Sequence, residues 1–152
     1  VYSDIIDISE DLEQELNVTR LPLDEVLQTA DVITLHVPLG TQTRHMISDR
    51  EFDMMKPTVI FINACRGPVV DEAALIRALN DGKVAAAGLD VLEQEPTPVD
   101  NPLLKMDNVL VTPHLAAFSQ EAGEKSRMFA ITNSARVAGG DEPDSVVPST
   151  DF

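Results

Sequence analysis

The feature that most constrains the fold is an alternation of short apolar runs with helical patterns along the chain. After a strand-like start at "VYSD", the apolar runs lie at 31–39, 58–65, 83–91 and 108–114. Such alternation is typical of βαβ units, whose strands lie parallel in one sheet. The sequence therefore predicts an α/β fold with a doubly wound parallel sheet. The predominantly apolar run at 58–65 is typical of a strand buried on both faces.

The helical patterns carry their own start and stop residues. They lie at 21–30, 71–82 and 119–138, and a further helix is expected after Ser48. Ser48 and Glu51 have the spacing of a capping box, which begins a helix. One face of the pattern at 71–82 is apolar, through Ala74, Leu75, Ala78 and Leu79. Gly82 follows this helix, and Gly139 and Gly140 follow the last one.

Charge and composition exclude several classes of function. The formal charge of −15 argues against nucleic acid or an anionic membrane as a partner, because either needs a cationic surface. No apolar run approaches the roughly 20 residues that cross a bilayer, so a soluble, cytoplasmic protein is expected. The single cysteine excludes an intrachain disulfide and a cysteine-cluster metal site. The acidic surface fits either an ordinary acidic bacterial enzyme or adaptation to high salt.

Polar residues stand at the ends of several apolar runs. Asp4 ends the first run, and Arg66 directly follows the run at 58–65. Asp90 lies near the end of the run at 83–91, and His114 closes the run at 108–114. Because functional groups gather at the carboxyl ends of parallel strands, these four side chains are expected at one edge of the sheet.

Each candidate has a chemical and a structural interpretation. Arg66 can hold a carboxylate through two hydrogen bonds, or cap carbonyl groups. His114 can give and take a proton, or be a satisfied histidine under a helix. Glu95 can orient an imidazole, or be a solvated loop residue. Asp90 can accept from an amide on a ligand, or cap a turn. Asp4 fits an acid that binds the ribose hydroxyls of a dinucleotide.

Four other residues have weaker claims. Asp7 competes with Asp4 for the ribose role. Cys65 has no nearby base in sequence and is expected to be a buried, inert thiol. His36, inside its strand, is expected to pack in the core, and His45 is expected at the surface.

Three long motifs resemble the signatures of the NAD-dependent D-2-hydroxyacid dehydrogenases, in that family's order. They are ADVITLHVPLGTQTRHMI, FINACRGPVVDEAALIRALNDGKVAAAGLDVLEQEP and NPLLKMDNVLVTPHLAAFSQEA. The resemblance runs from residue 1 to about residue 149 and implies a Rossmann-type fold. It implies that Arg66, in the pattern N-x-x-R-G, binds the carboxylate and oxo group of the substrate. Glu95 would pair with His114, which would protonate the oxo oxygen while nicotinamide delivers hydride to the same carbon.

The resemblance also implies a cofactor site for NAD. Asp90 matches the acid that holds the nicotinamide carboxamide. Asp4 matches the ribose acid, which favours NAD over NADP because it would repel a 2′-phosphate. Val37, Ala64 and Ala117 match positions that line the cofactor.

The chain departs from the family pattern at its start. No G-x-G-x-x-G loop occurs, and in the family this loop, the first strand and most of the substrate domain would precede residue 1. With the family's strand order 3-2-1-4-5-6-7, the central strand would be missing and apolar strand edges would be open. The resemblance thus divides the chain into a partial NAD-binding domain, 1–138, and a tail, 139–152, that returns toward the substrate domain.

The implied function is reduction of a 2-oxoacid to a D-2-hydroxyacid with NADH, as in a hydroxypyruvate or glyoxylate reductase. The family also implies a homodimer, and no metal is expected. Two alternatives stay open. One is an NADH-sensing corepressor of the same family, like the C-terminal-binding proteins. The other is a fragment that is inactive when isolated.

Overall fold

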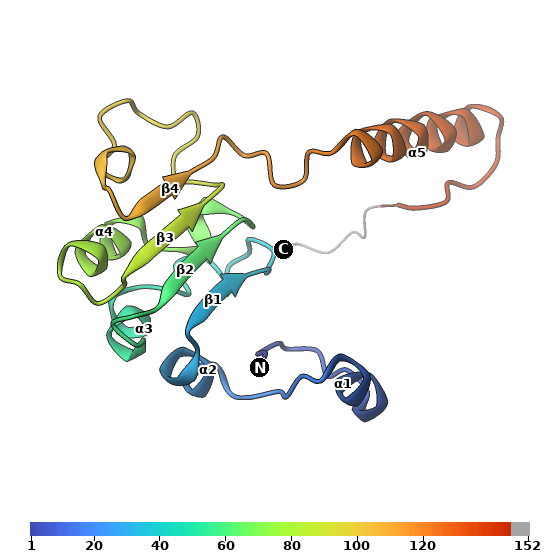
Figure 1. Ribbon diagram of the computed structural model, residues 1–152. Helices are drawn as coiled ribbons and strands as arrows, with labels where there is room; N and C mark the ends of the chain where they lie inside the picture. The colour runs from blue at the N-terminus through green and yellow to red at the C-terminus, as the bar shows by residue number, and fades with distance from the viewer. Residues whose placement is uncertain (147–152) are drawn as a thin grey trace. The chain divides into compact units, whose positions relative to one another are not determined.

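The computed structural model describes residues 1–146, which form two compact units. Residues 1–113 make the first unit, and the chain from His114 onward makes the second. Figure 1 traces the order of the elements along the chain.

A four-stranded parallel sheet organises the first unit. Its strands are β1 (Val32–Leu35), β2 (Ile60–Asn63), β3 (Ala86–Leu89) and β4 (Val109–Val111), in the order β1-β2-β3-β4. In register, Leu35 pairs with Asn63, and Asn63 pairs with Leu89. All three strand pairs are parallel, so the predicted parallel sheet is confirmed and the strands' carboxyl ends share one edge.

Three helices cover one face of this sheet (Figure 1). They are α2 (Leu23–Thr29), α3 (Asp49–Met54) and α4 (Glu72–Asn80). Their apolar sides meet the inward residues of the strands, and Phe52 packs edge-on against Phe61 with ring centroids 5.4 Å apart. The buried residues of α4 are the four predicted from its periodicity. The backbone N–H of Ser48 donates to Glu51 at 3.0 Å, as the capping-box spacing predicts.

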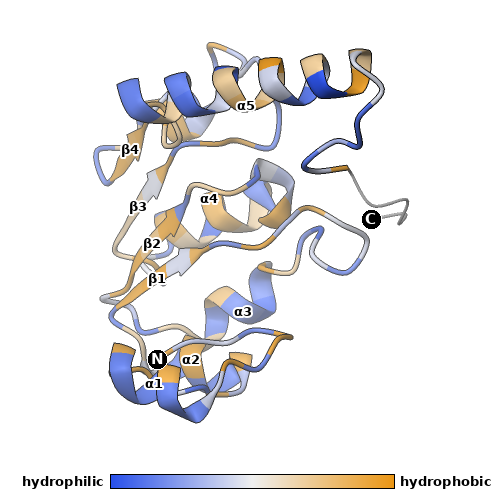
Figure 2. Cartoon of the chain, turned by 90° about the vertical axis from the view of Figure 1, so that its right-hand side faces the viewer, coloured by the Kyte–Doolittle hydropathy of each residue, from blue (hydrophilic) through white to orange (hydrophobic). Residues whose placement is uncertain are grey.

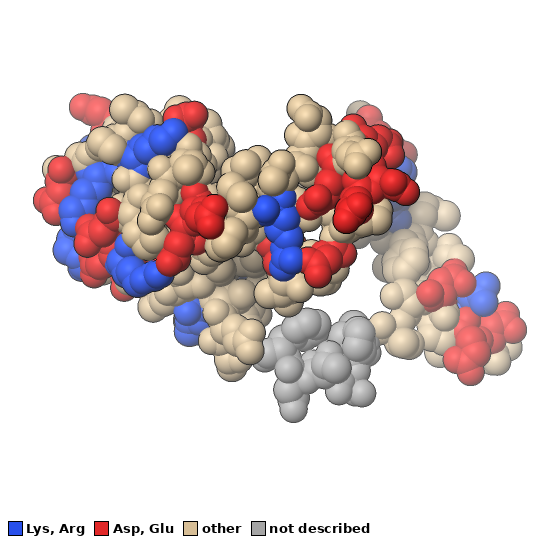
Figure 3. All heavy atoms as spheres, turned by 90° about the horizontal axis from the view of Figure 1, so that it is seen from below, with Lys and Arg blue, Asp and Glu red and all other residues tan. Residues whose placement is uncertain are grey.

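Ion pairs tie the outer surfaces of these helices together. Arg50 on α3 reaches Asp24 on α2 at 2.6 Å, and Arg77 on α4 reaches Asp49 on α3 at 2.7 Å. Figure 3 shows basic side chains lying among acidic ones on the face seen from below. Exposed pairs of this kind contribute at most about 1 kcal/mol each, so they add little to the stability that the apolar core provides.

The opposite face of the sheet is open within residues 1–113. Val32 is 52% exposed, Ile60 44% and Leu110 70%. The expectation that the strand at 58–65 is buried on both faces is therefore wrong, because buried residues (Val59, Phe61 and Asn63) alternate with the exposed Ile60 and the half-buried Ile62. His36 is exposed for the same reason, and its ring nitrogen Nε2 lies 3.0 Å from the Thr34 hydroxyl. The expected core position of His36 is thus also wrong.

The N-terminal segment stands apart from β1. The strand expected at residues 1–4 is reduced to one parallel bridge between Tyr2 and Arg20, because β1 pairs only with β2. The backbone N–H of Tyr2 donates to Thr19 and that of Leu21 to Tyr2, at 3.0 and 2.9 Å. A short helix, α1 (Glu10–Leu16), follows, with no buried residue.

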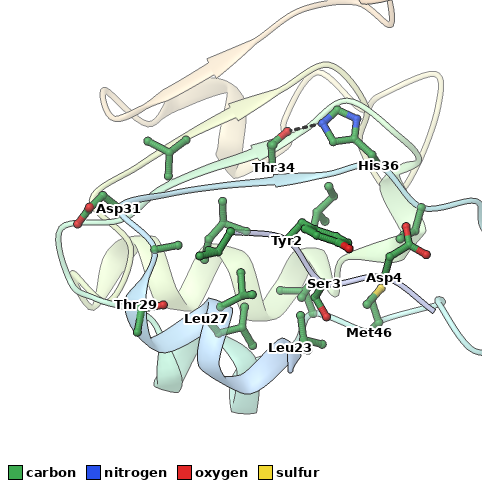
Figure 4. A pocket seen from close by; sticks show the side chains of 18 residues that line it. Tyr2, Ser3, Asp4, Leu23, Leu27, Thr29, Asp31, Thr34, His36 and Met46 are labelled. Carbon is green, nitrogen blue, oxygen red and sulfur yellow. Dashed lines mark hydrogen bonds between the residues drawn. The ribbon is translucent and has the colours of Figure 1, made fainter. Parts of the chain in front are cut away.

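A groove separates this bridge from β1. Its volume is about 670 Å³, and its walls come from the N-terminal segment, α2 and β1 (Figure 4). Tyr2, Ser3 and Asp4 line one side, and residues 31–37 line another. The predicted gap in the strand order thus coincides with an open groove in the first unit.

The second unit is built on one long helix, α5 (Gln120–Ala138). Its bounds confirm the predicted helix: the Ser119 hydroxyl accepts from the N–H of Ala122 at 3.0 Å, and Gly139 follows the last turn. Figure 2 shows apolar and polar residues alternating along α5. The apolar side chains of Met128, Phe129 and Ile131 on this helix are exposed.

The residues after α5 are only partly described. Asn133 accepts from the N–H of Asp144 at 2.6 Å and donates to the carbonyl of Ser145 at 3.0 Å, so 141–146 follow the helix as an irregular segment. The rest of the predicted polar tail, 147–152, lies outside the described residues. No helix within residues 1–146 has the length and apolar character needed to cross a bilayer.

Candidate active site

The carboxyl edge of the sheet carries two of the predicted polar residues, Arg66 and Asp90, whereas Asp4 lies on a segment that does not join the sheet. Arg66 follows β2 by three residues, and Asp90 follows β3 directly. Val37 lies two residues beyond β1, and Ala64 lies directly after β2. The parallel register carries these exits to one edge, which confirms the predicted location of Arg66 and Asp90 at strand ends.

The loop after β2 is shaped by a buried asparagine. Asn63 is 2% exposed; its side-chain amide donates to the carbonyl of Arg66 at 3.1 Å, and its oxygen accepts from the N–H of Cys65 at 3.1 Å. A buried amide with both ends bonded fixes the loop that presents Arg66. Sequence reasoning assigned Asn63 no role, although a polar residue ending an apolar strand marks such a position.

Arg66 itself is exposed beyond this loop. Its guanidinium donates to the carbonyl of Cys65 at 2.6 Å, and its fork faces the outside of the unit. Cys65 is only half-buried, and its thiol lies 3.1 Å from the Asn63 oxygen. The sulfur is thus part of the loop's hydrogen bonding, and the expected full burial of Cys65 is wrong.

Asp90 is a buried carboxylate at the end of β3. It is 7% exposed, its N–H donates to the carbonyl of Asn63 at 2.9 Å, and it accepts a short hydrogen bond from the Thr112 hydroxyl after β4. Burying a carboxylate is unfavourable unless donors satisfy it. Thr112, which sequence reasoning missed, is one donor that fixes Asp90 at this edge.

Two loops of the site meet at Gly67, the first residue of the 3-10 turn η1 (Gly67–Val69). A Cβ on Gly67 would lie 1.9 Å from the carbonyl oxygen of Leu92. The N–H of Leu92 in turn donates to the Glu95 carboxylate at 3.3 Å. Arg66 and Glu95 therefore stand on loops in direct contact.

His114 is the first residue of the second unit. It lies three residues after β4, and its φ of 56° is in the left-handed region. Pro113 joins it to the end of the sheet. The predicted pairing of His114 with Glu95 stays a prediction. Ala117 is exposed before α5, and its predicted cofactor role also stays a prediction.

The two acids predicted for ribose binding have different surroundings. Asp7 forms a close ion pair with Arg20. Asp4 accepts from the N–H of Ile6 at 2.9 Å, is exposed, and lines the groove with Val37 (Figure 4). Because Asp7 is engaged by a cation, these surroundings favour Asp4 as the acceptor for a ligand in the groove.

Comparison with known proteins places these features in a family. Residues 1–116 match the family described as "D-isomer specific 2-hydroxyacid dehydrogenase, NAD binding domain". A glyoxylate reductase of Korarchaeum cryptofilum is 44% identical, over 91% of this chain and 42% of the relative. A glyoxylate/hydroxypyruvate reductase B of Enterobacter sp. (strain 638) is 46% identical, over 84% of this chain and 40% of the relative.

A solved structure shows the same fold. D-lactate dehydrogenase with NAD+ from Lactobacillus jensenii superposes with a TM-score of 0.85 at 37% identity, over 96% of this chain and 47% of that one. The predicted Rossmann-type α/β fold is thereby confirmed. The chain spans less than half the length of each of these three proteins.

Proposed function

The chain belongs to the D-isomer specific 2-hydroxyacid dehydrogenases, within their NAD binding domain, and on this premise we propose that the complete protein reduces a 2-oxoacid to a D-2-hydroxyacid with NADH. Its relatives named as glyoxylate and hydroxypyruvate reductases favour a small 2-oxoacid as substrate.

The residues at the sheet edge suit a nicotinamide dinucleotide. Asp90 is an acceptor held for a carboxamide, and Asp4 is an acceptor beside the groove for ribose hydroxyls. When bound, NADH supplies the hydride that reduces the oxo carbon. Asp4 disfavours a 2′-phosphate by charge repulsion, so NADH is preferred over NADPH.

The chain's own side chains bind the substrate and move the proton. Arg66 binds the substrate carboxylate through its planar fork and orients the oxo group. Glu95 holds the imidazole of His114 and stabilises its protonated form. His114 gives that proton to the oxo oxygen, and in the reverse direction it takes the proton from the hydroxyl group.

One observation carries this proposal: the loops that bear Arg66 and Glu95 are in contact at Gly67 and Leu92, beside the buried Asp90. An anion anchor, a carboxylate for a histidine and a carboxamide acceptor are the parts that this reduction needs.

The test is an assay of the complete protein with NADH and a panel of glyoxylate, hydroxypyruvate, pyruvate and longer 2-oxoacids. The expected result is saturable NADH oxidation with a D-configured product from every 2-oxoacid whose reduction creates a stereocentre, and weaker activity with NADPH. No oxidation with any 2-oxoacid, together with NADH-dependent binding of a peptide partner, would instead support the corepressor function.

We propose in addition that the complete protein is a cytoplasmic homodimer whose NAD-binding domain includes residues 1–138, with 139–152 leading back to the substrate domain. The family resemblance supports this arrangement. Sedimentation of the complete protein tests the dimer, and a monomer at micromolar concentration would contradict it.

A further inference from the structure

A hydrogen-bonded cluster of polar side chains outside the proposed catalytic set joins the two site loops. It consists of His45, Glu72, Glu93 and Asn101, and we name it the carboxylate clamp. We propose that the clamp positions Glu95 against Arg66, so that His45 and Glu93 are positioning residues for the reaction. The inference rests on the proposed function.

Each carboxylate of the clamp accepts a hydrogen bond from the backbone N–H of the other residue. The N–H of Glu93 donates to Glu72 at 2.8 Å, and the N–H of Glu72 donates to Glu93 at 3.2 Å. Two like charges this close repel each other unless donors offset them. This arrangement therefore needs further donors to persist.

Those donors are present. The side-chain amide of Asn101 donates to the remaining Glu72 oxygen at 2.7 Å. The ring Nε2 of His45 lies 2.6 Å from the remaining Glu93 oxygen. An ionised carboxylate only accepts, so His45 Nε2 carries a hydrogen. All four carboxylate oxygens of Glu72 and Glu93 therefore have hydrogen-bond partners, and the two carboxylate groups are held in one arrangement.

The clamp holds three segments that meet at the site. The N–H of His45 donates to the carbonyl of Pro68 at 2.9 Å, and that of Asp71 donates to Ile47 at 2.9 Å, which ties 45–47 to the loop after Arg66. Glu72 opens α4 at the end of that loop. Glu93 follows Leu92, whose carbonyl faces Gly67. The clamp thus fixes how far the Glu95 loop stands from the Arg66 loop.

The backbone of His45 supports a dedicated role. Its φ is 52°, in the left-handed region that non-glycine residues rarely adopt. Such a conformation persists only where the surroundings hold it. The prediction that His45 lies at the surface is confirmed, since its side chain is 40% exposed, yet its hydrogen bond crosses to Glu93.

The test compares variants of the complete protein in kinetics, NADH binding and thermal unfolding. His45→Ala and Glu93→Ala should lower kcat and raise KM for the 2-oxoacid, each by about tenfold, because small displacements of positioned groups reduce rates strongly. The Kd for NADH should change less than about twofold. His45→Gln, which keeps a donor near Glu93, should recover most of the activity.

The matched control is Asp24→Asn, which breaks the Arg50–Asp24 pair of the same 2.6 Å length, between α3 and α2 and outside the clamp. It should leave kcat and KM unchanged even where it lowers Tm. If Glu93→Ala lowers Tm but leaves kcat and KM at the control's values, the clamp serves stability alone and the inference is wrong.

A second readout separates this inference from the proposed function. Amide hydrogen exchange at Glu72 and Glu93 should accelerate in His45→Ala but not in Asp24→Asn, whether or not the protein reduces 2-oxoacids. Unchanged exchange in His45→Ala would overturn the clamp even in an active enzyme. The wild-type protein could show slow amide exchange at Glu72 and Glu93 that depends on His45, and yet reduce no 2-oxoacid. The clamp would then stand as a loop-positioning device, and only the proposed reaction would be refuted.

Discussion

Asn63 and Asp90 are buried and hydrogen-bonded at the sheet edge, whereas Arg66 and Glu95 are exposed. The buried pair fixes the backbone, and the exposed pair is accessible to a small molecule. This division suits the roles proposed for Arg66 and Glu95, because groups that reach a ligand must still keep a set geometry.

Replacement of His114 with Ala in the complete protein should lower kcat by about 10²- to 10⁴-fold, the range expected when a general acid is removed. NADH affinity should stay within about twofold of wild type, because the proposed NADH contacts come mainly from Asp4 and Asp90. Stopped-flow reduction and NADH fluorescence titration measure the two quantities. Near-normal turnover would refute the role of His114.

Arg66→Lys keeps the charge but removes the planar fork. The expected result is an increase in KM for the 2-oxoacid of about 10- to 100-fold, from loss of a charge-assisted hydrogen bond worth about 1.5–3 kcal/mol. Arg44→Lys, at another exposed arginine, serves as the control and should behave as wild type. Equal KM values in Arg66→Lys and wild type would contradict carboxylate binding by the fork.

Single residues were predictable where strand ends could be read from the sequence. Arg66 and Asp90 follow apolar runs, so the parallel register alone carries them to the sheet edge. Asn63, Thr112 and the clamp could not be predicted in the same way. Their roles depend on hydrogen bonds across 20 or more residues, such as Thr112 to Asp90, or on a buried side chain within an otherwise apolar run.

At the scale of the elements, the start of α4 is held by two hydrogen bonds to its N-cap residue, Asp71. The Asp71 carboxylate accepts from the N–H of Ala74 and from the Ser48 hydroxyl, both at 3.0 Å. The first of these bonds, and then the second, hold the pKa of Asp71 below its ordinary value, although burial opposes them. The helix start is therefore sensitive to acid.

Asp71→Ala should lower the free energy of unfolding by about 0.5–2 kcal/mol at pH 7, the usual effect of losing an N-cap. Because the folded pKa is depressed, this stabilisation is present above the ordinary value of 3.8 and is lost as pH falls through the folded pKa. Urea unfolding at pH 7 and pH 3 should show the difference from wild type shrinking in acid. Asp107→Ala, in a turn outside the helices, is the control. A difference that stays constant with pH would rule out the Asp71 contribution.

Gly67→Ala should destabilise the complete protein by about 1–3 kcal/mol or more, because the added Cβ would overlap the Leu92 carbonyl. Gly82→Ala is the matched comparison. Gly82 has a φ of 70° but no atom within 4 Å of an added Cβ, so only the backbone penalty of about 1 kcal/mol applies. Chemical unfolding ranks the two variants. Equal losses would show that the Arg66 and Glu95 loops separate at little cost.

Helices and strands were predicted well where local pattern decides them, as in α4 and α5. The N-terminal strand was predicted less well, because a strand needs a partner along its whole length and the segment at residues 1–4 has one bridge. The predictions that His36 lies in the core and that β2 is buried on both faces were wrong for a related reason. Apolar composition does not say which face of a sheet another element covers.

At the scale of the whole molecule, the first unit has an open sheet face and an unpaired outer edge on β1. Exposed apolar strand surface of this kind promotes association with other chains. The net charge of −15 opposes association at low salt, and salt screens that repulsion.

The 152-residue chain alone should therefore self-associate as concentration and salt rise. Val32→Lys with Leu110→Lys, both on the open face, should reduce this association, whereas Val99→Lys in an exposed loop should not. Analytical ultracentrifugation measures the effect, and circular dichroism checks that the sheet is retained. Equal association of the wild-type chain, the double variant and Val99→Lys would show that the associating surface lies outside the open sheet face.

The groove beside β1 also affects how readily the N-terminal segment opens locally. Residues 1–22 contain no fully buried side chain, so they belong to the part of a structure that opens locally while the sheet stays folded. Asp4 lies on that segment, at the wall of the groove. An element that fills the groove and pairs with both walls slows this opening. Under the ribose role proposed for Asp4, the preference for NADH over NADPH depends on the population of the closed N-terminal segment as well as on the charge of Asp4.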